Sequence, residues 1–253
     1  MAGPVFCPQF VGDSAVVTHS SVLACPAQLA GELADSVQYQ GRKASRQGSE
    51  QRRLSILDAA LRIIVRDGLR GVRHRAVAAE AGVPLSATTY YFKDIQDLIS
   101  DSFVLFVERS SASLALLWAD IARDFQGLAG AVDANPLLRR QMAEQLIELI
   151  VAHVQAKVRD GNAELLAELA FRQEALTNPT LTPLAMAHQQ LRLQFAELAL
   201  RALGSAAPVE DAQVLTTLIL RMEYHALVDG ADNLDLPGQS AVLRRFLNLA
   251  IGL

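Results

Sequence analysis

The stretch Arg73–Lys93, RHRAVAAEAGVPLSATTYYFK, decides the fold of this chain. Its first half carries apolar residues at roughly helical intervals over Val77–Ala81, with charged residues on the other side. Gly82 ends this helix, because glycine readily takes the left-handed conformation that a helix end requires. Pro84 suits the first turn of a second helix, where its missing N–H is not needed. The spacing predicts two short helices joined by a tight turn.

The second of these helices begins with small and polar side chains that can approach DNA, as the N-terminal end of a recognition helix does in the major groove. Base readout is expected from Leu85, Ser86, Ala87 and Thr89, with help from Arg75 on the preceding helix. Contacts to phosphate or sugar are expected from Arg73, Tyr90, Tyr91 and Lys93. His74, on the polar side of the first helix, completes the predicted DNA-binding set. Phe92 should close the unit from the core side.

Charge is concentrated around the same stretch. From Arg42 to Lys93 there are 11 Lys plus Arg and 4 Asp plus Glu, a local excess of +7, although the whole chain of 253 residues carries only −4. The remainder of the chain therefore carries −11, since −4 minus +7 is −11. A basic block on an acidic chain is the footprint expected of a DNA-binding domain joined to a different module. A solvated helix face would give the same charge count, so both interpretations stay open on charge alone.

The segment AGVPLSATTYYFKDIQDL resembles the helix-turn-helix signature of the TetR (tetracycline repressor) family of transcription factors. The resemblance covers about Arg52 to Phe106 without a gap, and its matching residues are Gly68, Ala78, Ala81, Gly82, Val83, Tyr90, Tyr91, Phe92 and Leu98. Two positions depart from the family pattern. Thr89 stands where an aromatic residue is usual, and Ile95 stands where a phosphate-contacting lysine is common. The grip on the DNA backbone is then expected to rest more on Lys93 and the tyrosines.

Composition predicts an all-α protein. Hydrophobic residues make up 51% and charged residues 20%, which argues against a disordered chain. The only cysteines are Cys7 and Cys25, with no Cys/His cluster for a metal. No motif of a known enzyme class or cofactor site occurs, and no apolar run reaches the roughly 18 residues that span a membrane. We therefore expect a cytoplasmic protein that is not an enzyme, has no cofactor and binds no membrane.

Helix-breaking Gly and Pro residues divide the chain into three parts. Residues 1–49 are predicted to be a flexible extension, with a short helix near 26–36 and a basic arm, GRKASRQ, that either contacts DNA or is a solvated linker. Residues 50–94 form the three-helix DNA-binding domain. Residues 95–253 form a helical domain for effector binding and dimerisation. About nine helices are expected in all, which is also what the resemblance implies.

An effector site is expected among the fourth to seventh helices, mostly because the family resemblance implies one. The predicted ligand is a small, largely apolar molecule, with His153 or Gln190 as polar contacts. The residues assigned to this site are Phe106, Trp118, Met142, Leu146, His153, Phe171, Met186 and Phe195. The alternative is a solid core, since aromatic and Met residues at helical spacing usually pack there.

The last two helices carry more apolar surface than one small bundle needs to cover. The residues assigned to a dimer interface are Leu215, Leu218, Ile219, Met222, Val242, Phe246, Leu247 and Ala250. The resemblance implies that two such helix pairs join as a four-helix interface, whereas the alternative is that these residues complete the core of one chain.

Three functional hypotheses follow from the sequence. The first is a homodimeric regulator of double-stranded DNA, a repressor that binds a near-palindromic operator and is released by a ligand. The second is a DNA-binding protein of the same fold that answers to a protein partner or to no effector. The third is a helical-bundle enzyme or carrier, in which the basic segment is incidental.

Overall fold

A computed structural model describes residues 39–42, 47–125, 135–159, 162–230 and 233–253. Within these ranges the regular structure is helical throughout, with nine α-helices, as expected for an all-α fold. The short helix expected near residues 26–36 lies outside the described residues.

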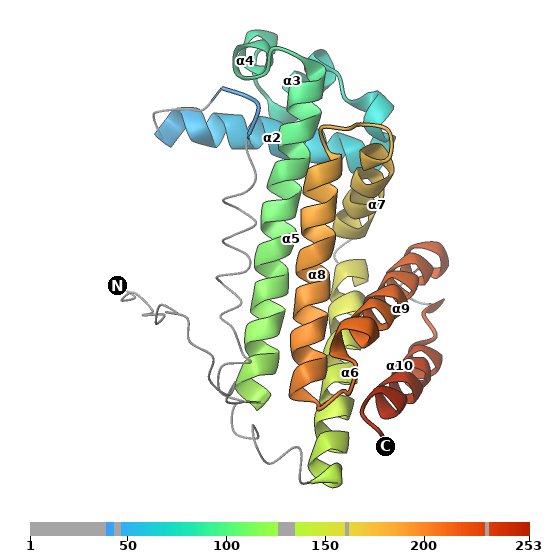
Figure 1. The fold of residues 1–253 in the computed structure, drawn as a ribbon. Coiled ribbons are helices and arrows are strands. Elements are labelled where there is room, and N and C mark those ends of the chain that lie inside the picture. The colour runs from blue at the N-terminus through green and yellow to red at the C-terminus, as the bar shows by residue number, and fades with distance from the viewer. Residues whose placement is uncertain (1–38, 43–46, 126–134, 160–161, 231–232) are drawn as a thin grey trace, which may run out of the picture.

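Three α-helices and one short 3-10 helix form a head at one end of the molecule (Figure 1). In chain order they are α2 (Gln47–Asp67), η2 (Leu69–Gly71), α3 (His74–Ala81) and α4 (Leu85–Tyr91). The buried face of α2 is apolar, and Ile56, Leu57 and Ile63 are among the least exposed side chains of the structure. In Figure 1, α2 lies across the end of the upright helices, and α3 and α4 lie above it.

The other helices form the body, and α5 connects it to the head (Figure 1). Their bounds are α5 (Ile95–Phe125), α6 (Pro136–Arg159), α7 (Ala163–Ala175), α8 (Thr182–Ala202), α9 (Pro208–Asp229) and α10 (Leu236–Ala250). Helices α5, α6 and α8 run upright, α7 lies against α2, and α9 and α10 lie to one side. The head is therefore joined to the body both through α5 and through the packing of α7 on α2.

Local residue chemistry explains where α5 begins. Asp94 precedes the helix, and its side-chain Oδ1 accepts a hydrogen bond from the Gln96 N–H at 3.1 Å. In return the Asp97 side chain accepts the N–H of Asp94 at 3.4 Å, so each residue satisfies a backbone donor of the first turn.

Helix α5 is also the most apolar long helix of the chain. Its Ile95–Ala119 portion is long and apolar enough to cross a membrane by length and composition alone, with half of the window buried inside the structure. Phe103, Leu105 and Phe106 pack in the core, and the same portion carries the fully buried Asp101. The packing accounts for the apolar character of α5 as that of a core helix between head and body.

Candidate nucleic-acid interface and internal cavity

The turn between α3 and α4 has the geometry that the sequence predicts. Gly82 adopts φ 64° and ψ 33°, in the left-handed region, and ends α3. The next residue, Val83, donates its N–H to the Ala78 carbonyl at 3.0 Å and packs against the core. Pro84 then precedes the first turn of α4, and Phe92 closes the unit with a fully buried ring. These contacts fix the direction of α4 relative to α3.

Most residues of the predicted DNA-binding set share one property, which is an exposed side chain. The exposed members are Arg73, Arg75, Leu85, Ser86, Thr89, Tyr90 and Lys93, while His74 and Ala87 are partly buried. Leu85, with 43% exposure, and Tyr90, with 53%, are large apolar side chains that the chain itself leaves uncovered. The N-terminal end of α4 is therefore available to a partner.

Tyr91 is the exception, and the structure corrects its predicted role. Its side chain is only 5% exposed. The hydroxyl lies 2.7 Å from the Ser49 Oγ and donates to the Ser49 carbonyl at 3.1 Å. Successive helix residues point about 100° apart, so Tyr90 faces outward while Tyr91 packs against α2. Tyr91 thus holds the recognition helix on α2, and a phosphate cannot reach it in this arrangement.

Ion pairs sort the basic residues of the head into two groups. Arg62 and Arg66 both pair with Glu80, at 2.8 Å and 3.0 Å, and Arg53 pairs with Glu50 at 2.7 Å. These arginines connect α2 to α3 or to its own first turn. The second group has no ion pair with another described residue and consists of Arg42, Arg52, Arg70, Arg73, Arg75 and Lys93. The local basic excess therefore resides on side chains that remain available to an anion.

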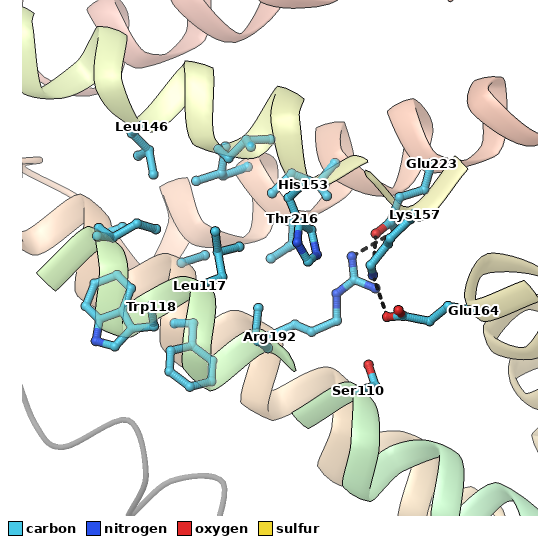
Figure 2. A pocket seen from close by; sticks show the side chains of 18 residues that line it. Ser110, Leu117, Trp118, Leu146, His153, Lys157, Glu164, Arg192, Thr216 and Glu223 are labelled. Carbon is cyan, nitrogen blue, oxygen red and sulfur yellow. Dashed lines mark hydrogen bonds and ion pairs between the residues drawn. The ribbon is translucent and has the colours of Figure 1, made fainter. Parts of the chain in front are cut away.

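A cavity of about 90 Å³ lies inside the body, with walls from α5, α6, α7, α8 and α9 (Figure 2). One end is apolar. Trp118 lies there with its ring centroid 5.9 Å from that of Phe195, and the indole Nε1 is buried without a hydrogen-bond partner among the described residues. The other apolar walls come from Leu114, Leu117, Ile121, Leu146, Ile150, Leu215 and Ile219. This end is suited to the apolar body of a ligand.

The opposite end of the cavity is charged (Figure 2). Arg192 pairs with Glu168, and its Nη2 donates to Glu223 at 3.0 Å. Lys157 lies 3.0 Å from Glu164 and 3.4 Å from Glu223. Burial by itself would lower the pKa of Lys157, but the neighbouring carboxylates outweigh it and raise that pKa, so the amine stays charged. No sequence pattern singles out these residues, because they are far apart in the chain.

Two histidines lie near the charged end, and both are neutral near pH 7. Burial lowers the pKa of His188 to about 4, and its Nε2 lies 3.1 Å from the Ser110 Oγ in the cavity wall. Burial, together with the nearby Lys157, lowers the pKa of His153 to about 4. A neutral imidazole can donate with one nitrogen and accept with the other. Both side chains therefore add hydrogen-bonding capacity without charge.

The structure divides the residues assigned to the effector site. Trp118, Leu146, His153 and Phe195 line the cavity together. Phe171 and Phe106 instead pack with Phe103 in an aromatic core, where the Phe171 ring is 4.9 Å from the Phe103 ring and 6.2 Å from the Phe106 ring. Met142 is buried outside the lining, and Met186 is 66% exposed. Gln190 is exposed as well. Helical spacing alone could not distinguish these faces.

A groove of about 530 Å³ lies beside the cavity, between the head and the body. Ser110 and Glu164 line both spaces. The other walls of the groove include Asp58, Arg62 and Arg66 of α2 and Glu80 of α3. The charged end of the cavity is thus close to side chains that hold α2 and α3 together.

The residues assigned to a dimer interface are also divided by burial. Leu215, Met222 and Leu247 are buried inside the single chain, so a second copy cannot contact them in this conformation. Leu218, Ile219, Phe246 and Ala250 are partly buried against the core, and Val242 is exposed. The large apolar side chains that α9 and α10 leave exposed are Val209, Val214, Tyr224, Val228, Val242 and Leu249. Four of the eight residues predicted for the dimer interface are thus partly buried. Most of the apolar residues that are exposed on α9 and α10 were not in the predicted set.

Comparisons with known proteins agree with this architecture. Residues 56–101 match the family described as bacterial regulatory proteins, tetR family. A transcriptional regulator from Rhodococcus sp. Rha1 is 14% identical, with a TM-score of 0.57 over 79% of this chain and 96% of that one. A regulator from Saccharomonospora viridis, solved in complex with choline, is 20% identical, with a TM-score of 0.54 over 79% and 96% of the two chains.

A member of the TetR family from Streptomyces coelicolor A3 is 26% identical, with a TM-score of 0.49 over 78% of this chain and 98% of that one. A search of curated proteins finds no match. The helix-turn-helix head on a helical body defines an all-α DNA-binding protein. The head matches the tetR family of bacterial regulatory proteins over residues 56–101, and the fold of the chain is that of solved transcriptional regulators.

Proposed function

We propose that this regulator is a homodimeric repressor that binds a near-palindromic operator and releases it when a small molecule occupies the cavity. The observation that carries the proposal is the position of α5. Only residues 92–94 separate this helix from the end of the recognition helix α4, and it supplies Ser110, Trp118 and Ile121 to the cavity wall. A ligand that favours one position of α5 would therefore also favour one position of the head.

Base readout is assigned to exposed or partly exposed residues at the start of α4, with Arg75 assisting from α3. The α4 residues are Leu85, Ser86, Ala87 and Thr89. Phosphate contacts are assigned to Arg73, Tyr90 and Lys93, which are exposed around the same helices, with His74 beside Arg73. Phosphate contacts position the protein, and base contacts specify the sequence.

Dimerisation is assigned to α9 and α10. On α9 the exposed residues Val214, Thr217, Arg221, Tyr224 and Val228 recur every three or four residues and so lie on one face. Val242 and Leu249 are exposed on α10. Two copies joined through these faces present two recognition helices, and half-sites about 34 to 36 Å apart or somewhat more follow from the two-fold symmetry.

Substitution of Val228 tests this assembly. Val228→Glu introduces charge on the exposed face of α9 and is expected to convert the dimer to a monomer at micromolar concentration. Leu176→Glu is the matched control, because Leu176 is also exposed but follows α7. Analytical ultracentrifugation measures the mass of each variant. A monomeric wild type, on and off DNA, contradicts the homodimer.

The effector is assigned an apolar body and a polar group. The apolar body would occupy the Trp118 end, and the polar group would face Lys157, Arg192 and Glu223. The sequence predicted a largely apolar ligand. The charged end of the cavity implies that this ligand also carries a polar group. That a regulator of the same fold was solved with choline supports small-ligand binding by this architecture.

The coupling between cavity and operator has an expected size. Allosteric coupling of about 1 to 3 kcal/mol changes affinity by roughly 5 to 150-fold. A ligand must bind one position of α5 better than the other, because equal affinity for both would shift nothing. The groove that shares Ser110 and Glu164 with the cavity offers a second route from the ligand to α2.

The deciding experiment is a footprint of the purified protein on DNA upstream of its own gene and the neighbouring gene, repeated with a panel of metabolites. The expected ligand stabilises the free protein against heat and weakens DNA binding. The variant Leu146→Trp, which fills the apolar end of the cavity, should lose the response to that ligand while still protecting the operator. If the panel contains no ligand that does both, the interpretation without a small effector is favoured; if no DNA is protected, the repressor proposal is wrong.

A further inference from the structure

Residues 39–42 precede α2 and pack on the junction of α4 and α5 (Figure 1, blue trace). The Tyr39 hydroxyl donates to the Glu108 Oε2 at 2.6 Å. The guanidinium of Arg53 lies 4.2 Å from the centroid of the Tyr39 ring. This part of the N-terminal extension therefore has defined contacts with α2 and α5, although the sequence predicts a flexible extension over residues 1–49.

Asp101 of α5 is the main hydrogen-bond acceptor for this segment. Its side chain is 0% exposed, and its two oxygens accept the N–H groups of Gln40 at 2.6 Å and Gly41 at 3.0 Å. Arg53 Nη1 lies 3.6 Å from the same carboxylate. A buried carboxylate is costly unless it is paired and hydrogen-bonded. In this structure the backbone of residues 40 and 41 supplies those hydrogen bonds.

Gly41 is required by the closeness of the contact. A Cβ at this position would lie 2.7 Å from the Asp101 Oδ2 and 2.7 Å from the Phe92 ring. Both neighbours are buried side chains, so neither has room to move. The backbone can approach the carboxylate only because glycine has no side chain.

This docking determines the position of Arg42. Its N–H donates to the Tyr91 carbonyl at the end of α4, at 2.9 Å, and its guanidinium lies 4.6 Å from the centroid of the Tyr90 ring. The side chain is exposed, and no carboxylate among the described residues pairs with it. Arg62 and Arg66 differ, since both are neutralised by Glu80. A guanidinium stacked on a ring keeps its planar edge free for a phosphate.

We propose that residues 39–42 are a docked part of the DNA-binding head, with Arg42 as a contact to the DNA backbone and Asp101 as its positioning residue. The proposal rests on the proposed binding of an operator. Tyr90 and Arg42 together form a small exposed platform at the end of the recognition helix. A phosphate contact carries no sequence information. Arg42 therefore contributes affinity on every DNA sequence and leaves the preference for the operator unchanged.

The test uses the full chain and two duplexes, one selected from a random library by the wild-type protein and one scrambled duplex of the same composition. Dissociation constants are measured between about 0.05 and 0.5 M salt. One phosphate contact contributes about 0.9 to the slope of log affinity against log salt. Arg42→Ala is expected to make the slope shallower by about 0.9. The affinity of the variant relative to the wild type should therefore fall about eightfold as the salt concentration is lowered from 1 M to 0.1 M. The loss should be equal on both duplexes.

Arg140→Ala is the matched control, because Arg140 is exposed on α6 and Figure 1 shows the start of that helix at the end of the molecule opposite the head. Asp101→Asn tests positioning and Gly41→Ala tests docking. Each should reduce affinity in the same direction as Arg42→Ala, and adding Arg42→Ala to either should cost little more. Faster hydrogen exchange at residues 40–42, with core amides of α2 unchanged, reports undocking directly.

The outcomes separate this inference from the broader proposal. The role of Arg42 is overturned if Arg42→Ala keeps the wild-type affinity and salt slope, or if it loses no more affinity than Arg140→Ala. The proposal of operator binding is unaffected by either outcome. Additive losses for Arg42→Ala and Gly41→Ala overturn the positioning role. If the wild-type chain binds neither duplex, both proposals are wrong.

Discussion

Arginines serve two different purposes in the head and in the body of this regulator. In the head, Arg73 and Arg75 are exposed and have no ion pair among the described residues. In the body, Arg192 is largely covered and pairs with the buried Glu168 and Glu223. An exposed cation is well solvated and can exchange water for a phosphate, whereas a buried cation requires a protein carboxylate. Function in the head depends on charges left unpaired, and stability in the body depends on charges that are paired.

The largest effect is expected from removal of the arginine that pairs with two buried glutamates. Arg192→Ala leaves Glu168 and Glu223 without their principal partner, and breaking a buried pair costs about 3 to 5 kcal/mol. Urea unfolding at pH 7 measures the loss. The control is Arg201→Ala on the same helix, whose pair with Glu197 at 2.6 Å is exposed and is worth about 0.3 to 0.5 kcal/mol. Equal losses for the two variants would remove the contrast between buried and exposed pairs.

A second effect concerns pH and is confined to the body. Because His153 and His188 have a pKa of about 4 in the fold and 6.5 in the unfolded chain, the unfolded state binds more protons between these values. The free energy of unfolding should therefore fall as pH decreases from about 6.5 to 4, by at most about 3 kcal/mol for each histidine. Below about pH 4 both states are protonated, and this contribution becomes constant.

The measurement for this prediction is urea unfolding at several pH values between 7 and 4.5. The double variant His153→Gln, His188→Gln should show a flatter profile than the wild type. The difference between the two proteins isolates the histidines from carboxylates that titrate at lower pH. Parallel profiles would mean that neither imidazole is buried in its neutral form.

A third effect tests the corrected role of Tyr91. Tyr91→Phe removes the hydroxyl that contacts Ser49 and should reduce the stability of the fold by about 0.5 to 1.5 kcal/mol. The salt slope of DNA binding should not change, since no phosphate contact is lost. Tyr90→Phe is the control from the adjacent exposed position, and it should leave stability unchanged. A shallower salt slope for Tyr91→Phe would restore the original prediction of a phosphate contact.

The smallest change is expected from one exposed charge of the head. Lys93→Ala should leave thermal stability unchanged and weaken binding equally on operator and scrambled DNA, with a salt slope shallower by about one. Ser86→Ala is the comparison, because a base-reading residue should alter which sequence is preferred. If both variants lose affinity equally on both DNAs, the division between phosphate contact and base readout is wrong.

The sequence by itself determined the local elements of this protein. Gly82 and Pro84 have backbone preferences that specify the turn between α3 and α4. These signals are local, since they depend on residues within one or two helical turns. The same signals predicted the helix-turn-helix and its resemblance to the TetR family, whereas composition predicted the all-α fold.

Only the tertiary structure decided which of two similar side chains is available to a partner. Tyr90 and Tyr91 are neighbours of the same type, and the packing of α4 on α2 alone buries one of them. Lys157, Glu168, Arg192 and Glu223 come from four helices, so their pairing has no signature in the sequence. Asp101 and Gly41 likewise meet 60 residues apart. Helical periodicity defines faces, but which faces meet depends on the packing of the whole chain.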